Sequence, residues 1–366
     1  MAAPTTPSEI SHTERTLPRA VVVLLAAAAL TITLAGVRSI SGILGPTFLA
    51  LVLVVTVHPW RTWLERKGLP RWAASVFVVV VTYAIIIAIT LSLVVAVGRL
   101  AVLVPHYSGK FDDIINDAGN WLQARGVGQD QVEKAAKALD IGKLVSAATS
   151  ILGAILNVLT NLFFIALVLL FMTFDTPGTL RGLQAAKRAR PDLVNAVENF
   201  AAGTRSYMVV STVFGLIVAI IDTAVLAIIG VPGAFVWGVL SFVTNFIPNI
   251  GFIIGLVPPA LLGLLDGGVS EMVIVIVAYC VINVVIQTVI QPRIVGDAVG
   301  LSTTLTFLSL AFWAWALGAL GALLAVPLSL LVRSLLVEAD PDARWLLPLI
   351  SGKPEEIRHP DVAADD

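Results

Sequence analysis

The chain has little cysteine and little charge. Cys280 is its only cysteine, so no disulfide can form within the chain and no thiolate cluster can hold a metal. Only 13% of the 366 residues are charged, about half the share of a soluble domain, and 58% are hydrophobic. The formal net charge of −1 gives no overall field that would attract nucleic acid. This composition indicates a protein that crosses a membrane several times and binds no nucleic acid.

The sequence also lacks the motifs of common enzyme classes. It contains no G-x-x-x-x-G-K-[ST], no H-E-x-x-H and no G-x-S-x-G, which excludes a P-loop ATPase, a zinc protease of that type and an α/β-hydrolase. The four histidines are scattered over predicted tails and loops. We therefore expect no enzyme activity, no cofactor and no metal.

Long apolar runs are what the sequence does contain, and they predict an all-α, polytopic transmembrane protein. About 20 apolar residues cross the ~30 Å hydrocarbon core as a helix. Residues 234–265 and 303–335 are each over 30 residues long, about 50 Å as straight helix, and do not fit one span. Single full spans are predicted at 20–37, 40–57, 73–98, 151–174, 207–229 and 271–291.

Both over-length stretches contain helix breakers near the middle. Pro248 and Gly251 interrupt the first, and Gly318, Gly321 and Pro327 interrupt the second. Paired interrupted segments are typical of the discontinuous helices that build a transporter's binding site. We predict two re-entrant hairpins that turn at these residues. Two plain crossings, which would give eight spans, are the alternative.

Basic residues predict the orientation and, with the apolar runs, the division of the chain. They are concentrated in 58–72 and 175–206, so both loops and both termini are expected on the cytoplasmic side of the membrane. The hairpin arrangement then leaves Asp266 and Glu271 outside, and plain crossings would reverse this. The predicted parts are a disordered cytoplasmic tail (1–16), an N-terminal three-span bundle (17–98), an extracytoplasmic amphipathic helical domain (99–150), a transport core (151–336) and a cytoplasmic tail (337–366).

Asp222 is the only carboxylate deep in the apolar spans. The chain is uncharged from Ser206 to Ile221 and from Thr223 to Leu265. A charge at that depth costs at least about 2.5–3.5 kcal/mol, so it must be partnered, protonated or facing water. Asp222 is therefore a candidate group for binding a proton or a sodium ion. A hydrogen bond that packs neighbouring helices is the structural alternative.

Neutral amides form a second candidate set. Asn283, Gln287 and Gln291 are spaced i, i+4, i+8 and share one helix face, and Asn245 and Asn249 flank Pro248 one turn apart. Unpaired amides are expensive in hydrocarbon, so these faces should meet protein or water. They suit a pathway for a small polar solute, or else hydrogen bonds between helices.

Four motifs in order then resemble the autoinducer-2 exporter (AI-2E) family over residues 200–335. They are Gly230-Val-Pro232, the run from Asn245 to Gly251 with Pro258 after it, Gln291-Pro-Arg-Ile-Val-Gly296, and Gly318-x-x-Gly321 leading to Ala325-Val-Pro327. Phe252 and Leu301-Ser-Thr303 depart from the family pattern. The third motif adds Pro292 and Arg293 to the candidate pathway.

The resemblance implies an integral inner-membrane transporter that forms homo-oligomers, with lipid as its surroundings. Members are assigned export of autoinducer-2 or sodium/proton antiport. Our first hypothesis is a secondary transporter, an exporter of a small polar solute, in which the amides contact the solute and Asp222 couples transport to protons or sodium. A Na⁺/H⁺ antiporter without an organic substrate and a non-transporting membrane scaffold are the alternatives.

Overall fold

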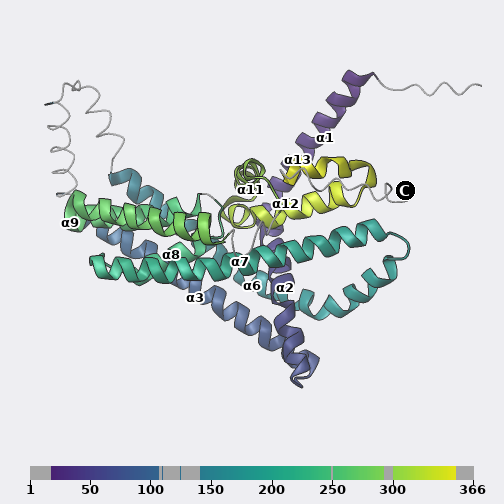
Figure 1. The fold of residues 1–366 in the computed structure, drawn as a ribbon, viewed down its shortest axis with the longest axis horizontal. Helices are drawn as coiled ribbons and strands as arrows, with labels where there is room; N and C mark the ends of the chain where they lie inside the picture. The colour runs from purple at the N-terminus through teal and green to yellow at the C-terminus, as the bar shows by residue number, and fades with distance from the viewer. Residues whose placement is uncertain are drawn as a thin grey trace, which may run out of the picture.

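A computed structural model describes residues 18–106, 109, 124, 141–248, 250–291 and 300–351. Every regular element in these ranges is a helix, and seven helices are long and apolar enough to cross a membrane (Figure 1). This confirms the all-α polytopic prediction. The predicted tail 1–16, most of the domain 99–150 and residues 352–366 lie outside the described ranges.

Within the described ranges, the connections between successive helices are short. Their bounds are α1 Arg19–Ser39, α2 Ser41–Arg66, α3 Arg71–His106, α6 Ile141–Ala186, α7 Pro191–Ile229, α8 Ala234–Thr244, α9 Gly251–Asn283, the π-helix η1 Val284–Ile290, α11 Thr303–Leu323, α12 Ala325–Arg333, the π-helix η2 Ser334–Glu338, the 3-10 helix η3 Pro341–Leu346 and α13 Leu347–Ser351. Helix α3 packs along α6, and α2 contacts α3, α6, α7 and α11.

Several helices continue well beyond the predicted spans. Helix α6 has 46 residues and α7 has 39, about 70 and 60 Å at 1.5 Å per residue. Residues 175–206, expected as a loop, are instead a helical arm with its turn between Ala186 and Pro191, at the right of Figure 1. Hydropathy marks where a helix leaves the lipid, whereas helix-forming polar residues let the same helix continue into water.

The first over-length stretch folds back on itself, as predicted. Helix α8 has 11 residues, about 16 Å, which is half of a hydrocarbon core. The chain turns at Asn245–Pro248 and Ile250, and α9 returns along α8. The two helices pack so closely that a Cβ on Gly251 would lie 1.8 Å from the Thr244 carbonyl oxygen, and one on Gly255 would lie 3.4 Å from Ser241 Cα. Gly251 therefore allows the close return of the chain as well as the turn itself.

A second reversal follows within α9, at Gly268, whose φ is 80°. Residues 263 and 272 would be about 14 Å apart in a straight helix. A Cβ on Gly263 would nevertheless lie 3.4 Å from the Met272 backbone nitrogen, so the two halves of α9 run antiparallel. The part after Gly268 and η1 together contain the predicted span 271–291.

The second over-length stretch also reverses, at Gly318, where φ is 67°. A Cβ on Gly321 would lie 1.9 Å from the Trp313 carbonyl oxygen, although the two residues are eight positions apart. The Trp313 indole N–H donates to Ser329 Oγ of α12 at 3.1 Å, which ties the two arms together. Pro327 is not at the reversal. It is the third residue of α12, and the N–H groups of the first helical turn have no partner within the helix, so proline breaks no hydrogen bond there.

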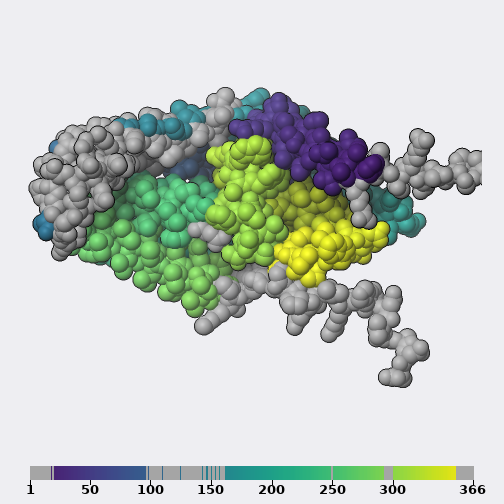
Figure 2. All heavy atoms as spheres, turned by 90° about the horizontal axis from the view of Figure 1, so that it is seen from above, coloured from purple at the N-terminus to yellow at the C-terminus, as the bar shows by residue number. Residues whose placement is uncertain are grey.

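Figure 2 shows how the second hairpin sits in the molecule. Helix α11, in yellow-green, lies between the green surface of α8 and α9 and the yellow surface of the C-terminal helices, with purple α1 beside it. Helix α12 packs on α7, and α11 packs on α1 and α2. The two hairpins are therefore both held by α7 or its neighbours.

Two prolines inside helices are each matched by an arginine of a neighbouring helix that is not next in the chain. Pro177 in α6 removes the N–H that would bond the Thr173 carbonyl, and Arg61 Nη1 of α2 donates to that oxygen at 3.0 Å. Pro59 in α2 likewise frees the Val55 carbonyl, which accepts from Arg205 Nε of α7 at 3.2 Å. These two bonds connect α7 to α2 and α2 to α6.

This matching predicts strong coupling between Arg61 and Pro177. Arg61→Met should lower the free energy of unfolding by about 2 kcal/mol, the loss of a hydrogen bond from a charged donor to a buried carbonyl. In a Pro177→Ala background the loss should shrink to about half or less, because alanine restores the helical N–H. Denaturant titration in mixed micelles measures both, with Arg66→Met as the control. Equal losses of unfolding free energy in the two backgrounds would show that Arg61 does not compensate for the N–H that Pro177 lacks.

Candidate functional site

Asp222 lies at the crossing of three helices. It is fully buried on α7, and its Oδ2 accepts a 2.5 Å hydrogen bond from Ser241 Oγ of α8. Its Oδ1 and the Tyr279 hydroxyl of α9 are both buried without a hydrogen-bond partner among the described residues. The Tyr279 hydroxyl is also close enough to Asp222 for the two side chains to interact electrostatically. The site therefore keeps free capacity to bind a proton, a cation or a hydroxyl.

The close approach of α7 and α8 produces this contact. Gly230 and Gly233, both with positive φ, reverse the chain between the two helices. A Cβ on Gly238 would lie 1.8 Å from Thr223 Oγ1, so glycine is required for α8 to lie against α7 at this depth. Ser241 then stands one turn further along α8, facing Asp222.

Three of the predicted amides form a connected network at the tip of the first hairpin. Gln287 Nε2 donates to Asn245 Oδ1 at 2.7 Å and to Asn283 Oδ1 at 2.8 Å. Asn245 Nδ2 donates to the Ser211 carbonyl of α7 at 3.3 Å, and Asn283 Nδ2 to the Tyr279 carbonyl at 2.8 Å. The network joins α7, the hairpin tip and η1 through side chains that can exchange partners.

Neighbouring residues hold the tip in place. The Tyr207 hydroxyl of α7 donates to the Phe246 carbonyl at 2.8 Å, which satisfies a main-chain group of the turn. A Cβ on Gly215 would lie 2.8 Å from Asn245 Nδ2, so the missing side chain on α7 leaves the room that the amide occupies. Gln287 lies within the π-helix η1, a form of helix that occurs frequently at functional sites.

The structure groups some of the predicted pathway residues and separates others. Asn245, Asn283 and Gln287 share the network, Asp222 contacts the same hairpin through Ser241, and Pro248 and Gly251 form its turn. Among the described residues, no hydrogen bond joins Gln291 to the network. Three predicted residues, Asn249, Pro292 and Arg293, lie outside the described ranges.

Two functional candidates were missed at the level of sequence, although a signal for both was present. Tyr279 precedes Asn283 by four residues and extends the polar face of Asn283, Gln287 and Gln291 by one more turn. Ser241 precedes Asn245 by the same spacing on α8. A search for hydroxyl groups at i−4 from each amide would have found both.

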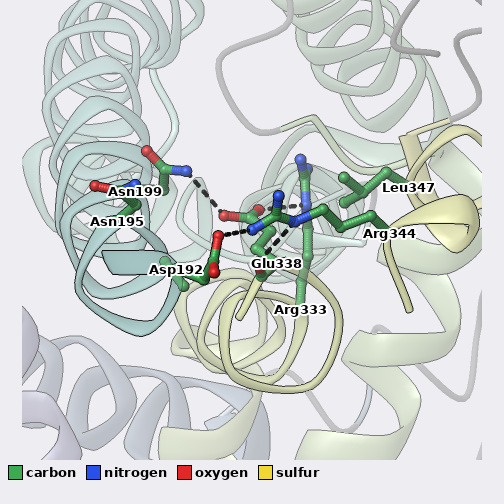
Figure 3. Close-up of a pocket in the computed structure, with 8 residues that line it drawn as sticks. Asp192, Asn195, Asn199, Arg333, Glu338, Arg344 and Leu347 are labelled. Atoms are coloured by element: carbon green, nitrogen blue, oxygen red, sulfur yellow. Dashed lines mark hydrogen bonds and ion pairs between the residues drawn. The ribbon is translucent and has the colours of Figure 1, made fainter. Parts of the chain in front are cut away.

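A polar cavity of about 420 Å³ lies at the other end of α7 (Figure 3). Its charges are paired with one another. Arg333 Nε lies 2.9 Å from Glu338 Oε1, Arg344 bonds Asp192, and Asn199 Nδ2 donates to Glu338 Oε2 at 3.0 Å. Arg333 also donates to the Gly300 carbonyl just before α11, at 2.5 Å. This network fastens the C-terminal helices to α7 and leaves little charge for a ligand.

The amide network predicts different outcomes for two substitutions on the same helix. Gln287→Met should lower the free energy of unfolding by about 1–3 kcal/mol, because it leaves the Asn245 and Asn283 oxygens without this donor. Gln291→Met, which breaks no bond of the network, should change the free energy by less than about 0.5 kcal/mol. Denaturant titration of both purified variants checks this, and similar losses would show that the network contributes no stability.

Comparison with known proteins identifies the family of this chain. The family model described as AI-2E family transporter matches residues 20–339. The AI-2 transport protein TqsA of Escherichia coli K12 is 32% identical, over 83% of this chain and 88% of TqsA. YhhT of the same strain, named as a candidate transport protein, is 27% identical over 91% of this chain and 95% of its own length. With seven helices long enough to span a membrane, the chain belongs to the AI-2E family of membrane transporters.

Proposed function

We propose that this protein is a secondary transporter that exports a small polar solute, and that the solute resembles autoinducer-2. The proposal rests on one observation above all: a connected set of amides lies at the tip of the first hairpin, and a buried carboxylate bonds the same hairpin through Ser241. Membership of the family and the name of TqsA, an AI-2 transport protein, support it.

The amide network is suited to a solute with several hydroxyl groups. Each amide offers two donors and an acceptor, so solute hydroxyls can replace the bonds between Asn245, Asn283 and Gln287 one for one. The exchange leaves no buried group unpaired, which keeps the barrier to binding low. The tip of the first hairpin would move with the solute, because Asn245 belongs to it.

Asp222 is the proposed coupling residue. Its free Oδ1 can take up a proton or bind a sodium ion, and its Oδ2 is bonded to Ser241 on the moving hairpin. A change of charge at Asp222 therefore alters the strength of a bond that holds α8 against α7. Coupling and hairpin movement would depend on the same contact.

The proposed placement in the membrane follows from the charges and the reversals. Both termini and the α6–α7 arm would lie in the cytoplasm of a bacterial inner membrane, and the Gly268 turn with Asp266 and Glu271 would lie outside. Both hairpins would then be re-entrant. We further propose that the protein acts as a homo-oligomer, as the resemblance to its family implies.

Transport in proteoliposomes tests these roles. Wild-type protein should accumulate labelled autoinducer-2 against its gradient when a proton or sodium gradient is applied. Asp222→Asn should abolish accumulation while downhill flux continues, and Asn245→Ala should reduce both by about ten-fold, the effect of losing about 1.4 kcal/mol of solute binding. Glu198→Gln, an exposed carboxylate of the same helix, should behave as the wild type.

Two results would contradict the proposal. Unchanged accumulation by Asp222→Asn would remove its coupling role. Sodium-dependent proton flux in vesicles without any solute, unaffected when autoinducer-2 is added, would assign sodium/proton antiport instead.

A further inference from the structure

Three arginines surround a cavity that the transport proposal does not use. This basic cavity, of about 450 Å³, is lined by Arg61 and Glu65 of α2, by Arg71 at the start of α3, and by Arg181 of α6. Glu65 is its only carboxylate and is bonded to Arg61 at 2.9 Å. Within the described ranges, no carboxylate is paired with Arg71 or Arg181. The cavity therefore carries uncompensated positive charge.

Arg61 gives this charge a fixed position. It is 6% exposed, and its guanidinium is held by the Thr173 carbonyl and by Glu65. Arg181 is oriented by a 3.2 Å bond from its Nε to the Pro177 carbonyl, which leaves its other N–H groups available. Guanidinium groups held in this way match the geometry of phosphate oxygens.

An apolar cavity adjoins the basic one. It also measures about 450 Å³ and lies between α2, α6 and α7. His58, Thr176 and Leu180 line both cavities, so one begins where the other ends. Its other walls are mostly hydrocarbon, with Leu51, Val54, Met172, Leu183, Val197 and Phe200 among them. One carboxylate, Asp175, and one guanidinium, Arg205, also line it, so these two charges offset each other. Leu51 and Val54 lie about three and about two helical turns along α2 from Arg61, on the side of the predicted span.

Exposed tryptophans mark the level of the basic cavity. Trp60 and Trp63 at the end of α2 and Trp72 at the start of α3 are 69%, 51% and 67% exposed. Tryptophan side chains gather at the level of lipid headgroups. The basic cavity therefore lies where phosphate groups of the bilayer are found, and the apolar cavity extends from it.

We propose that the two cavities together bind one anionic phospholipid. Its phosphate lies against Arg71 and Arg181, with Arg61 behind them, and one acyl chain enters the space between α2, α6 and α7. A soluble phosphate ester would use only the basic half, so the adjoining apolar half favours a lipid. Basic pockets between helices of membrane proteins are suited to such headgroups.

A lipid in this place would contact three helices that pack on one another through apolar side chains and are also joined by single polar bonds. Arg61 connects α2 to α6, and Arg205 of the apolar cavity connects α7 to α2. A ligand that binds only the folded arrangement stabilises it by mass action. The lipid would therefore raise the thermal stability of the protein as well as remain bound to it.

Native mass spectrometry and thermal unfolding of the full chain in neutral detergent test the proposal. The probes are phosphatidylglycerol, phosphatidylcholine, glycerol 3-phosphate and inorganic phosphate. Phosphatidylglycerol should bind the wild type and raise its unfolding temperature. Arg71→Gln with Arg181→Gln should weaken that binding about 30-fold, about five-fold for each arginine removed. The matched controls, Arg66→Gln and Arg188→Gln, lie outside the cavity and should bind as the wild type does.

A second variant tests the apolar half. Ala201→Leu fills part of that cavity and should weaken phosphatidylglycerol without removing any charge. Equal binding of phosphatidylcholine, or equal losses in the Arg66/Arg188 and Arg71/Arg181 pairs, would overturn the proposal. Inorganic phosphate or glycerol 3-phosphate that displaces the lipid at equal concentration would overturn it too, in favour of a soluble phosphate.

Discussion

The need to satisfy main-chain and amide groups inside a membrane constrains this whole structure. A chain that reverses within hydrocarbon leaves polar groups that water cannot reach, and each group left unpaired destabilises the fold by several kcal/mol. At the tip of the first hairpin these groups are met by side chains: Tyr207 bonds the Phe246 carbonyl, and Gln287 bonds Asn245. Because the partners belong to α7 and η1, the turn is stable only when all three elements are together.

The same requirement explains the helices around the hairpins. Prolines at 59 and 177 free a carbonyl each, and the arginines that meet them come from adjacent helices. The hydrogen bond that each proline removes within its own helix is thus replaced by a hydrogen bond from a neighbouring helix. Glycines act in the complementary way, since Gly238, Gly251 and Gly321 let main chains approach more closely than any side chain would permit. The prolines and glycines that interrupt the helices therefore also create the contacts between them.

Much of the fold could be predicted from the sequence, because its signals are local. The apolar runs predicted the helices, and the helix breakers at Pro248, Gly251 and Gly318 predicted where the chain reverses. The α6–α7 arm could not be predicted as helix from hydropathy, which falls where the helix enters water. At the site, the i, i+4 spacing of Asn283 and Gln287 predicted a shared face, but not that Asn245 would be their partner, since that depends on how the first hairpin packs against the span that follows it. Ser241 and Tyr279 were missed because a lone hydroxyl in an apolar helix is common.

The proposed transport route depends on water reaching the hairpin tip at membrane depth. In a Cys280→Ser background, Ile250→Cys places a thiol in the turn, and Val257→Cys places one on the exposed apolar side of α9 as the control. A membrane-impermeant thiol reagent applied to sealed, oriented vesicles should modify the first from one side of the membrane and leave the second unmodified. An Ile250→Cys thiol that reacts from neither side, with or without solute, would show that the tip is dry and that no route passes it.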